Sequence, residues 1–265
     1  MFLFSQQSQQ EIPMITNWPL VFFTVLSQLG TGLALFAWWK DRHGDSPSSR
    51  TWQSAAVSAA VAAVASLVAF GGIASGSLLI AQTACLLLLV CSAAAMKKCS
   101  VCGLVAWIAG AVCVMSEALA AVPGDILSTS GLFPLVLFPL CTVILGAVFA
   151  QLKQMGEPDD PAVRYGRFYM PLRICLWIML VITAIAPCVA WDDPFMRKSA
   201  IIWMQTQLYW MGVIFSGVVI GLSHMGRITL LVQAIVAIVS ITGLRTAFYA
   251  DGVHGIIDMT TLYMH

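Results

Sequence analysis

Eight long apolar runs, separated by short breaks that contain charged residues, Gly or Pro, occupy most of this chain. The runs lie near residues 18–39, 52–72, 76–96, 101–122, 132–152, 169–191, 200–222 and 228–249. A helix needs about 20 apolar residues to cross a bilayer, and each run has about that length. Only 9% of the 265 residues are charged, too few to give such runs a water-soluble surface. The sequence therefore predicts an all-α integral membrane protein, a bundle of about eight transmembrane helices.

This pattern divides the chain into a polar N-terminal tail (1–17), an eight-helix transmembrane domain (18–250) and a short C-terminal tail (251–265). Eight spans use roughly 160 residues, so no soluble catalytic domain fits in the remainder. The N-terminal tail has no Lys or Arg and therefore lacks the basic segment of a signal peptide. The second run is rich in Ala and Ser, which favours a buried helix that packs closely against its neighbours.

The distribution of Lys and Arg predicts the orientation, because basic residues are retained on the cytoplasmic side. With the N-terminus outside, the inside loops hold most of the 13 basic residues, namely Lys40, Arg42, Arg50, Lys97, Lys98, Lys153, Arg164, Arg167, Arg173 and Arg227. The outside loops hold only Arg197, Lys198 and Arg245. We therefore expect both termini outside and a multi-pass protein of a bacterial cytoplasmic (inner) membrane.

Several function classes are disfavoured by the sequence. The net charge of +1 gives no basic field for nucleic acid. No nucleotide-binding loop, hydrolase elbow or zinc-protease motif is present. Cys99 and Cys102 form one C-x-x-C pair, but no second pair or nearby His completes a metal site. All four histidines, His43, His224, His254 and His265, fall in predicted loops or tails, so no haem is expected within the bundle.

Ionisable residues at the ends of the spans are the candidate functional groups, because such groups are unfavourable in lipid. Glu117 lies near the outer end of the fourth span and Arg245 near the outer end of the eighth. Glu117 could instead simply reach interfacial water. Tyr249 follows Arg245 by one helical turn, and Asp251 and His254 could gather beside it in an outer polar cluster.

Three stretches carry a resemblance to a known family. They are Trp18-Pro19-Leu20 with Phe23-Thr24-Val25 and Gln28 in the first span, Ile73-Ala74-Ser75-Gly76-Ser77 before the third, and Arg245-Thr246-Ala247-Phe248-Tyr249 at the end of the eighth. In order and spacing they resemble the membrane anchor subunit of dimethyl sulfoxide reductase. The resemblance implies a haem-free anchor that takes electrons from menaquinol near the outer face. Its implied partners are an iron-sulfur electron-transfer subunit and a molybdopterin catalytic subunit, which carry the clusters and the molybdopterin.

The chain departs from the family pattern at one place. The family usually has an acidic residue directly before the Ile-Ala-Ser-Gly-Ser stretch, where this chain has Gly71-Gly72, and a His in the preceding outer segment, which is absent here. Our candidates for quinol binding are therefore Glu117, Arg245, Tyr249, Asp251 and His254. Two alternatives remain: a purely structural anchor or assembly subunit, and a small multi-pass transporter.

Overall fold

The computed structural model describes residues 18–43, 48–74, 76–97, 99–120, 133–154, 204–222 and 231–246, with short pieces between 174 and 201. Within these residues the regular structure is helical and no strand occurs. Five helices are long and apolar enough to cross a membrane: α1 (Trp18–His43), α2 (Ser49–Phe70), α3 (Ser77–Ala95), α4 (Ser100–Ala120) and α5 (Phe133–Gln154). Their bounds match the first five predicted spans to within about one helical turn, which confirms the all-α, multi-pass class.

Two shorter apolar helices follow in the C-terminal part. They are α8 (Gln207–Leu222) and a helix at Leu231–Thr246, which we call the 231–246 helix. These helices pack closely, since a Cβ on Gly212 of α8 would lie under 3.0 Å from the Leu244 side chain. They coincide with the seventh and eighth predicted spans, and only helical pieces of the sixth are described. A total of eight crossings therefore stays a prediction.

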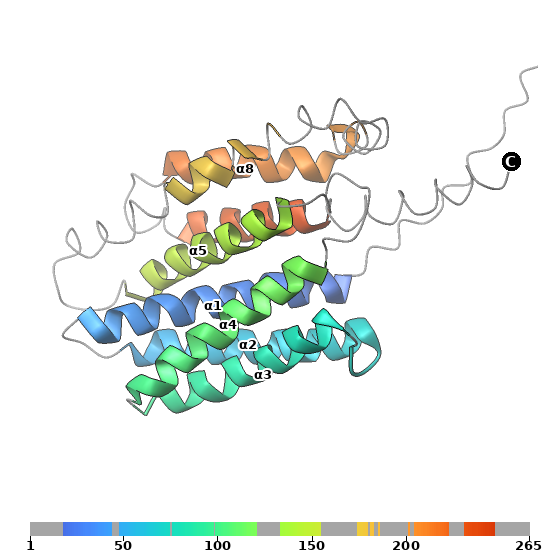
Figure 1. Cartoon of the computed structure of the whole chain (residues 1–265). Helices are drawn as coiled ribbons and strands as arrows, with labels where there is room; N and C mark the ends of the chain where they lie inside the picture. Colours follow the sequence, from blue (N-terminus) through green and yellow to red (C-terminus); the bar gives the residue numbers. More distant parts are fainter. Residues whose placement is uncertain are drawn as a thin grey trace, which may run out of the picture.

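Helix α1 lies at the centre of the bundle. It contacts α2, α4 and α5, and in Figure 1 it lies between α5 on one side and the α2–α3 pair on the other. Most of α1 is buried, whereas only a third of α2 is. Our expectation that α2 is the buried packing helix is therefore wrong. Its Ala face packs on α1, but the opposite face carries an exposed row of Val57, Val61, Val64 and Val68.

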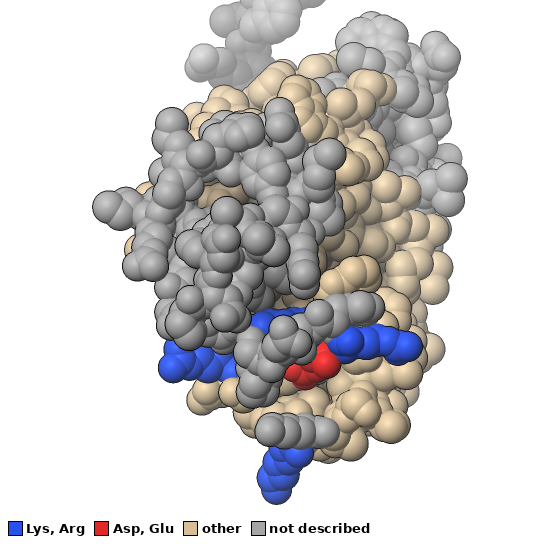
Figure 2. Space-filling view, turned by 90° about the vertical axis from the view of Figure 1, so that its left-hand side faces the viewer, with Lys and Arg blue, Asp and Glu red and all other residues tan. Residues whose placement is uncertain are grey.

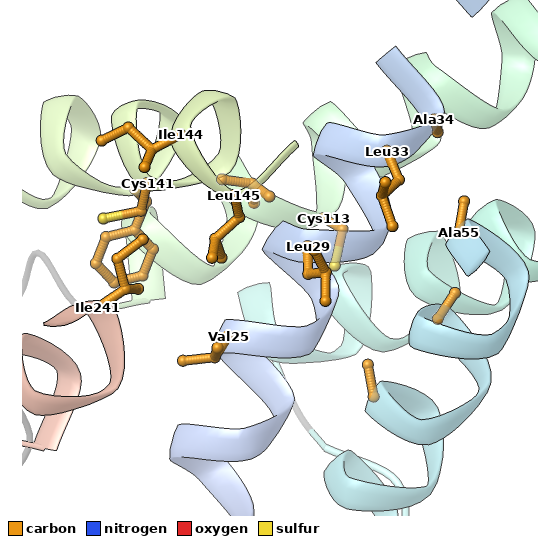
Figure 3. Close-up of a cluster of buried hydrophobic side chains, with 14 of the residues drawn as sticks. Val25, Leu29, Leu33, Ala34, Ala55, Cys113, Cys141, Ile144, Leu145 and Ile241 are labelled. Atoms are coloured by element: carbon orange, nitrogen blue, oxygen red, sulfur yellow. The ribbon is translucent and has the colours of Figure 1, made fainter. Parts of the chain in front are cut away.

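Two glycines bring α1 and α5 into close contact. A Cβ on Gly32 would lie under 3.0 Å from backbone atoms of Gly146, and a Cβ on Gly146 would meet the backbone of Gly32 in the same way. Small residues at facing positions let helix backbones approach closely in a membrane protein. Figure 3 shows part of the apolar core, to which Leu29 of α1, Leu145 of α5 and Ile241 of the 231–246 helix contribute side chains.

The turn between α1 and α2 is fixed by one carboxylate. Asp41 Oδ1 accepts hydrogen bonds from the backbone N–H of Ser48 (3.0 Å) and from Ser48 Oγ (2.6 Å). Asp41 Oδ2 accepts a third from Nε1 of Trp52 (2.6 Å), whose side chain is fully buried. These bonds set the angle at which α2 returns along α1.

Basic side chains gather at the same end of the bundle as this turn. The up-and-down order of the helices brings together the end of α1, the start of α2, and the ends of α3 and α5. Figure 2 views this end and shows the Lys and Arg side chains clustered there. The described residues of the set are Lys40, Arg42, Arg50, Lys97 and Lys153, all from the predicted inside loops. The opposite end holds the tight α2–α3 turn and the end of α4.

Candidate functional site: a buried acid and a buried guanidinium

Glu117 lies in the last turns of α4, where it faces α1 inside the bundle. Its side chain is 2% exposed, so it does not reach the surface as an interfacial carboxylate would. Ser27 Oγ of α1 donates a hydrogen bond to Glu117 Oε1 (2.6 Å), and Cys113 Sγ, one turn earlier on α4, lies 3.5 Å from the same oxygen. Glu117 Oε2 has no hydrogen-bond partner among the described residues. One carboxylate oxygen is thus held, and the other is available.

Arg245 lies one residue before the end of the 231–246 helix and is 1% exposed. Its guanidinium carbon lies 3.3 Å from the ring centroid of Phe138 in α5, a cation–π contact. None of its three side-chain nitrogens has a hydrogen-bond partner within the described part of the chain. Burying a guanidinium without hydrogen bonds is strongly unfavourable, so this side chain is a functional candidate on physical grounds.

The two ionisable groups belong to one cluster. The guanidinium of Arg245 lies within electrostatic reach of the Glu117 carboxylate and of the Cys141 thiol. The side-chain amide of Gln28 of α1 also approaches the Glu117 carboxyl group, although within the described part of the chain neither amide atom makes a hydrogen bond of standard geometry. The cluster therefore combines an acid, a cation and an amide, contributed by α4, the 231–246 helix and α1.

The structure brings together two of the five predicted site residues, Glu117 and Arg245. Tyr249, Asp251 and His254 lie outside the described residues. The candidate list omitted the polar residues of α1 that face the cluster. Thr24, Ser27, Gln28 and Thr31 recur at helical spacing within an apolar span and are all buried. That spacing is the sequence signal for a polar stripe directed into a membrane bundle.

The α2–α3 turn places two glycines in backbone conformations that other residues rarely adopt. Gly71 and Gly72 have φ values of 63° and 144°, in the region that side chains other than Gly rarely adopt. Gly72 N–H donates to Leu67 O (3.0 Å), which closes the last turn of α2. The Gln82 amide completes the turn, as it accepts from Ala74 N–H and donates to Gly72 O. The backbone conformation of this turn therefore favours glycine at both positions.

The cluster places a hydrogen-bond acceptor and a group with several hydrogen-bond donors inside the helix bundle. A free carboxylate oxygen can accept a hydrogen bond or a proton, and a guanidinium can donate several hydrogen bonds but cannot be deprotonated. No group of His, Cys, Asp or Glu in the described ranges is arranged to hold a metal ion.

Comparison with protein-family models gives no match, and no curated protein matches the sequence.

Proposed function

We propose that this chain is the membrane anchor of an oxidoreductase complex similar to dimethyl sulfoxide reductase, and that it oxidises menaquinol at the Glu117–Arg245 cluster. It crosses a bacterial cytoplasmic membrane eight times with both termini outside. The electrons pass to an iron-sulfur subunit and on to a molybdopterin catalytic subunit. The motifs at Trp18, Ile73 and Arg245 support the partner assignment, and the buried cluster supports the site.

The observation that carries the proposal is that the buried Oε2 of Glu117 and the buried guanidinium of Arg245 both lack a hydrogen-bond partner among the described residues. A quinol has two hydroxyl groups, which become carbonyls when it loses two protons and two electrons. A carboxylate can accept one of those protons, and Arg245 can donate hydrogen bonds to the oxygen on which negative charge develops. The same pair therefore serves binding and proton removal.

The expected position of the cluster in the membrane agrees with this role. Basic residues gather at the opposite end of the bundle, and the positive-inside rule assigns that end to the cytoplasm. Glu117 and Arg245 then lie toward the outer face. Protons released there leave on the outer side, while the electrons pass to the docked iron-sulfur subunit.

The experiment uses the complex isolated in mild detergent, with a menaquinol analogue as the electron donor. We expect the analogue to reduce the iron-sulfur clusters of the partner, followed by their spectroscopic signal. Glu117→Gln should slow this reduction about 10²-fold, the low end for loss of a general base, while the complex stays assembled. Ser92→Ala is the matched control, because Ser92 is also buried and its hydroxyl has no hydrogen-bond partner among the described residues, but it lies near the basic end of α3.

Two outcomes would overturn the assignment. If Glu117→Gln and Ser92→Ala reduce the clusters at the same rate, the cluster is not the quinol site. If the chain purifies without larger redox subunits, it is not an anchor of this class. An intact complex that no quinol analogue can reduce would indicate a purely structural anchor.

One observation also favours a small transporter as a second candidate. A buried acid and a buried base within membrane helices commonly mark an ion or proton pathway. The transporter predicts proton-coupled uptake by vesicles that contain this chain alone, with loss of uptake in Glu117→Gln. The anchor predicts no uptake, so the vesicle assay separates the two functions.

A further inference from the structure

Two cysteines lie side by side at the basic end of the bundle, away from the Glu117–Arg245 cluster. Cys99 is the residue before α4, and Cys102 lies in the first turn of that helix. Their Sγ atoms are 2.6 Å apart, and both cysteines are free. Residues three apart at a helix start have Cα atoms at a separation that a disulfide can bridge. The pair could therefore be linked without rearrangement of the helix.

The local structure activates Cys99 as a nucleophile. Cys99 is fully exposed and stands at the N-cap of α4, where its sulfur accepts a hydrogen bond from the backbone N–H of Cys102 (3.4 Å). The hydrogen bond from the Cys102 thiol, together with the backbone N–H groups of Cys102 and Val101, lowers the pKa of the Cys99 thiol. A lowered pKa means that more of the thiol is in the reactive thiolate form at neutral pH.

A basic residue and a third thiol lie near the Cys99–Cys102 pair. Lys97, an exposed cation, precedes Cys99 by two residues, and Cys91 at the end of α3 is the third thiol in electrostatic reach. No arrangement of ligands for a metal ion occurs among the described residues at this end. Cys99 is the more accessible of the two thiols, since Cys99 is exposed and Cys102 is partly buried.

We propose that Cys99 and Cys102 form a reversible dithiol–disulfide pair that reacts with small disulfides of the glutathione type. Cys99 is the attacking residue and Cys102 is the resolving residue. This inference is independent of the quinol chemistry and of the Glu117–Arg245 cluster.

The reaction proceeds by two exchanges that balance in atoms and electrons. The Cys99 thiolate attacks one sulfur of the small disulfide, forms a mixed disulfide and releases the other half as a thiol. The Cys102 thiol then loses its proton, attacks Cys99 Sγ and displaces the second thiol. The net reaction converts one small disulfide and two protein thiols into two small thiols and the Cys99–Cys102 disulfide.

The test uses inside-out membrane vesicles that contain the full chain, treated with oxidised glutathione and then with a maleimide. We expect the oxidised protein to take up two fewer maleimides than the reduced protein, and peptide mass spectrometry to find the Cys99–Cys102 disulfide. In Cys102→Ser the mixed disulfide cannot be resolved, so a glutathione adduct should accumulate on Cys99. Reduced glutathione should restore both thiols in the wild type.

The matched control is Cys91→Ser, which should form the disulfide as the wild type does. The proposal is overturned if both thiols of the wild type stay open to maleimide in oxidised glutathione. It is equally overturned if Cys102→Ser carries no adduct on Cys99, or if the disulfide joins Cys91 instead. Because each variant is read by mass rather than by activity, quinol oxidation does not influence the result.

Discussion

At the scale of single residues, Glu117 and Arg245 are held by different kinds of contact. Glu117 accepts hydrogen bonds from Ser27 Oγ and Cys113 Sγ, whereas Arg245 lies against the face of Phe138. A buried charge is tolerated when an opposite charge is near, and removal of one partner leaves the other unopposed. The stability of each group therefore depends on the presence of the other.

This dependence predicts the outcome of a double-mutant cycle. Arg245→Met should destabilise the bundle because it leaves the Glu117 carboxylate without a nearby cation. Adding Glu117→Gln should recover part of the loss, with a coupling energy of about 1–3 kcal/mol. The measurement is unfolding of the four proteins in the same detergent. Additive effects of the two changes would show that the groups do not interact.

At the scale of helices, α1 organises the bundle because three neighbours pack on it. Gly30 faces the backbone of α2, Gly32 meets α5, and the Thr31 side chain fills the space beside Gly110 of α4. The same stretch of α1 also presents Ser27 and Gln28 to the cluster. The same two turns of α1 therefore determine both the packing of the neighbouring helices and the position of the polar side chains in the cluster.

A single methyl group tests this arrangement. Gly32→Ala places a Cβ against backbone atoms of α5, which cannot move as a side-chain tip can. We expect a loss of about 1–3 kcal/mol of stability, measured as a lower melting temperature in detergent. Gly217→Ala of α8 is the control, since no atom of the described residues lies within 4 Å of the added Cβ. Equal melting temperatures for the two variants would contradict the close α1–α5 contact.

At the scale of the whole molecule, the up-and-down order of the helices places surface basic residues and buried ionisable residues at opposite ends of the bundle. Exposed basic side chains collect at one end, and the buried Glu117 and Arg245 lie toward the other. The first end suits the cytoplasmic surface and its anionic lipids. The two ends of the bundle are therefore chemically distinct.

Reporter fusions test the orientation that follows. A reporter that is active only in the cytoplasm should work when fused after Lys97, and one that is active only outside should work after Gly72 or at His265. The Gly72 and Lys97 fusions lie at opposite ends of α3, so each serves as the control for the other. If the Gly72 fusion is active outside, a cytoplasmic His265 would remove the eight-span layout, since an odd number of crossings would then separate the two points.

The helices and their approximate bounds are determined by the sequence alone, because apolar length and the position of charged breaks are local properties. For the same reason the sequence predicts which end of the bundle is basic. It also identifies Glu117 and Arg245 as unusual residues, since each is an ionisable group near the end of an apolar span.

Only the tertiary structure decides which helix is central and which polar groups meet. The Ala and Ser of α2 indicate close packing, but they do not reveal that its Val face is left uncovered, because burial depends on the neighbours a helix acquires. Likewise, Glu117 and Arg245 are far apart in the sequence. Their proximity, and the hydrogen bond from Ser27 of α1 to Glu117 of α4, follow from how the helices pack around α1.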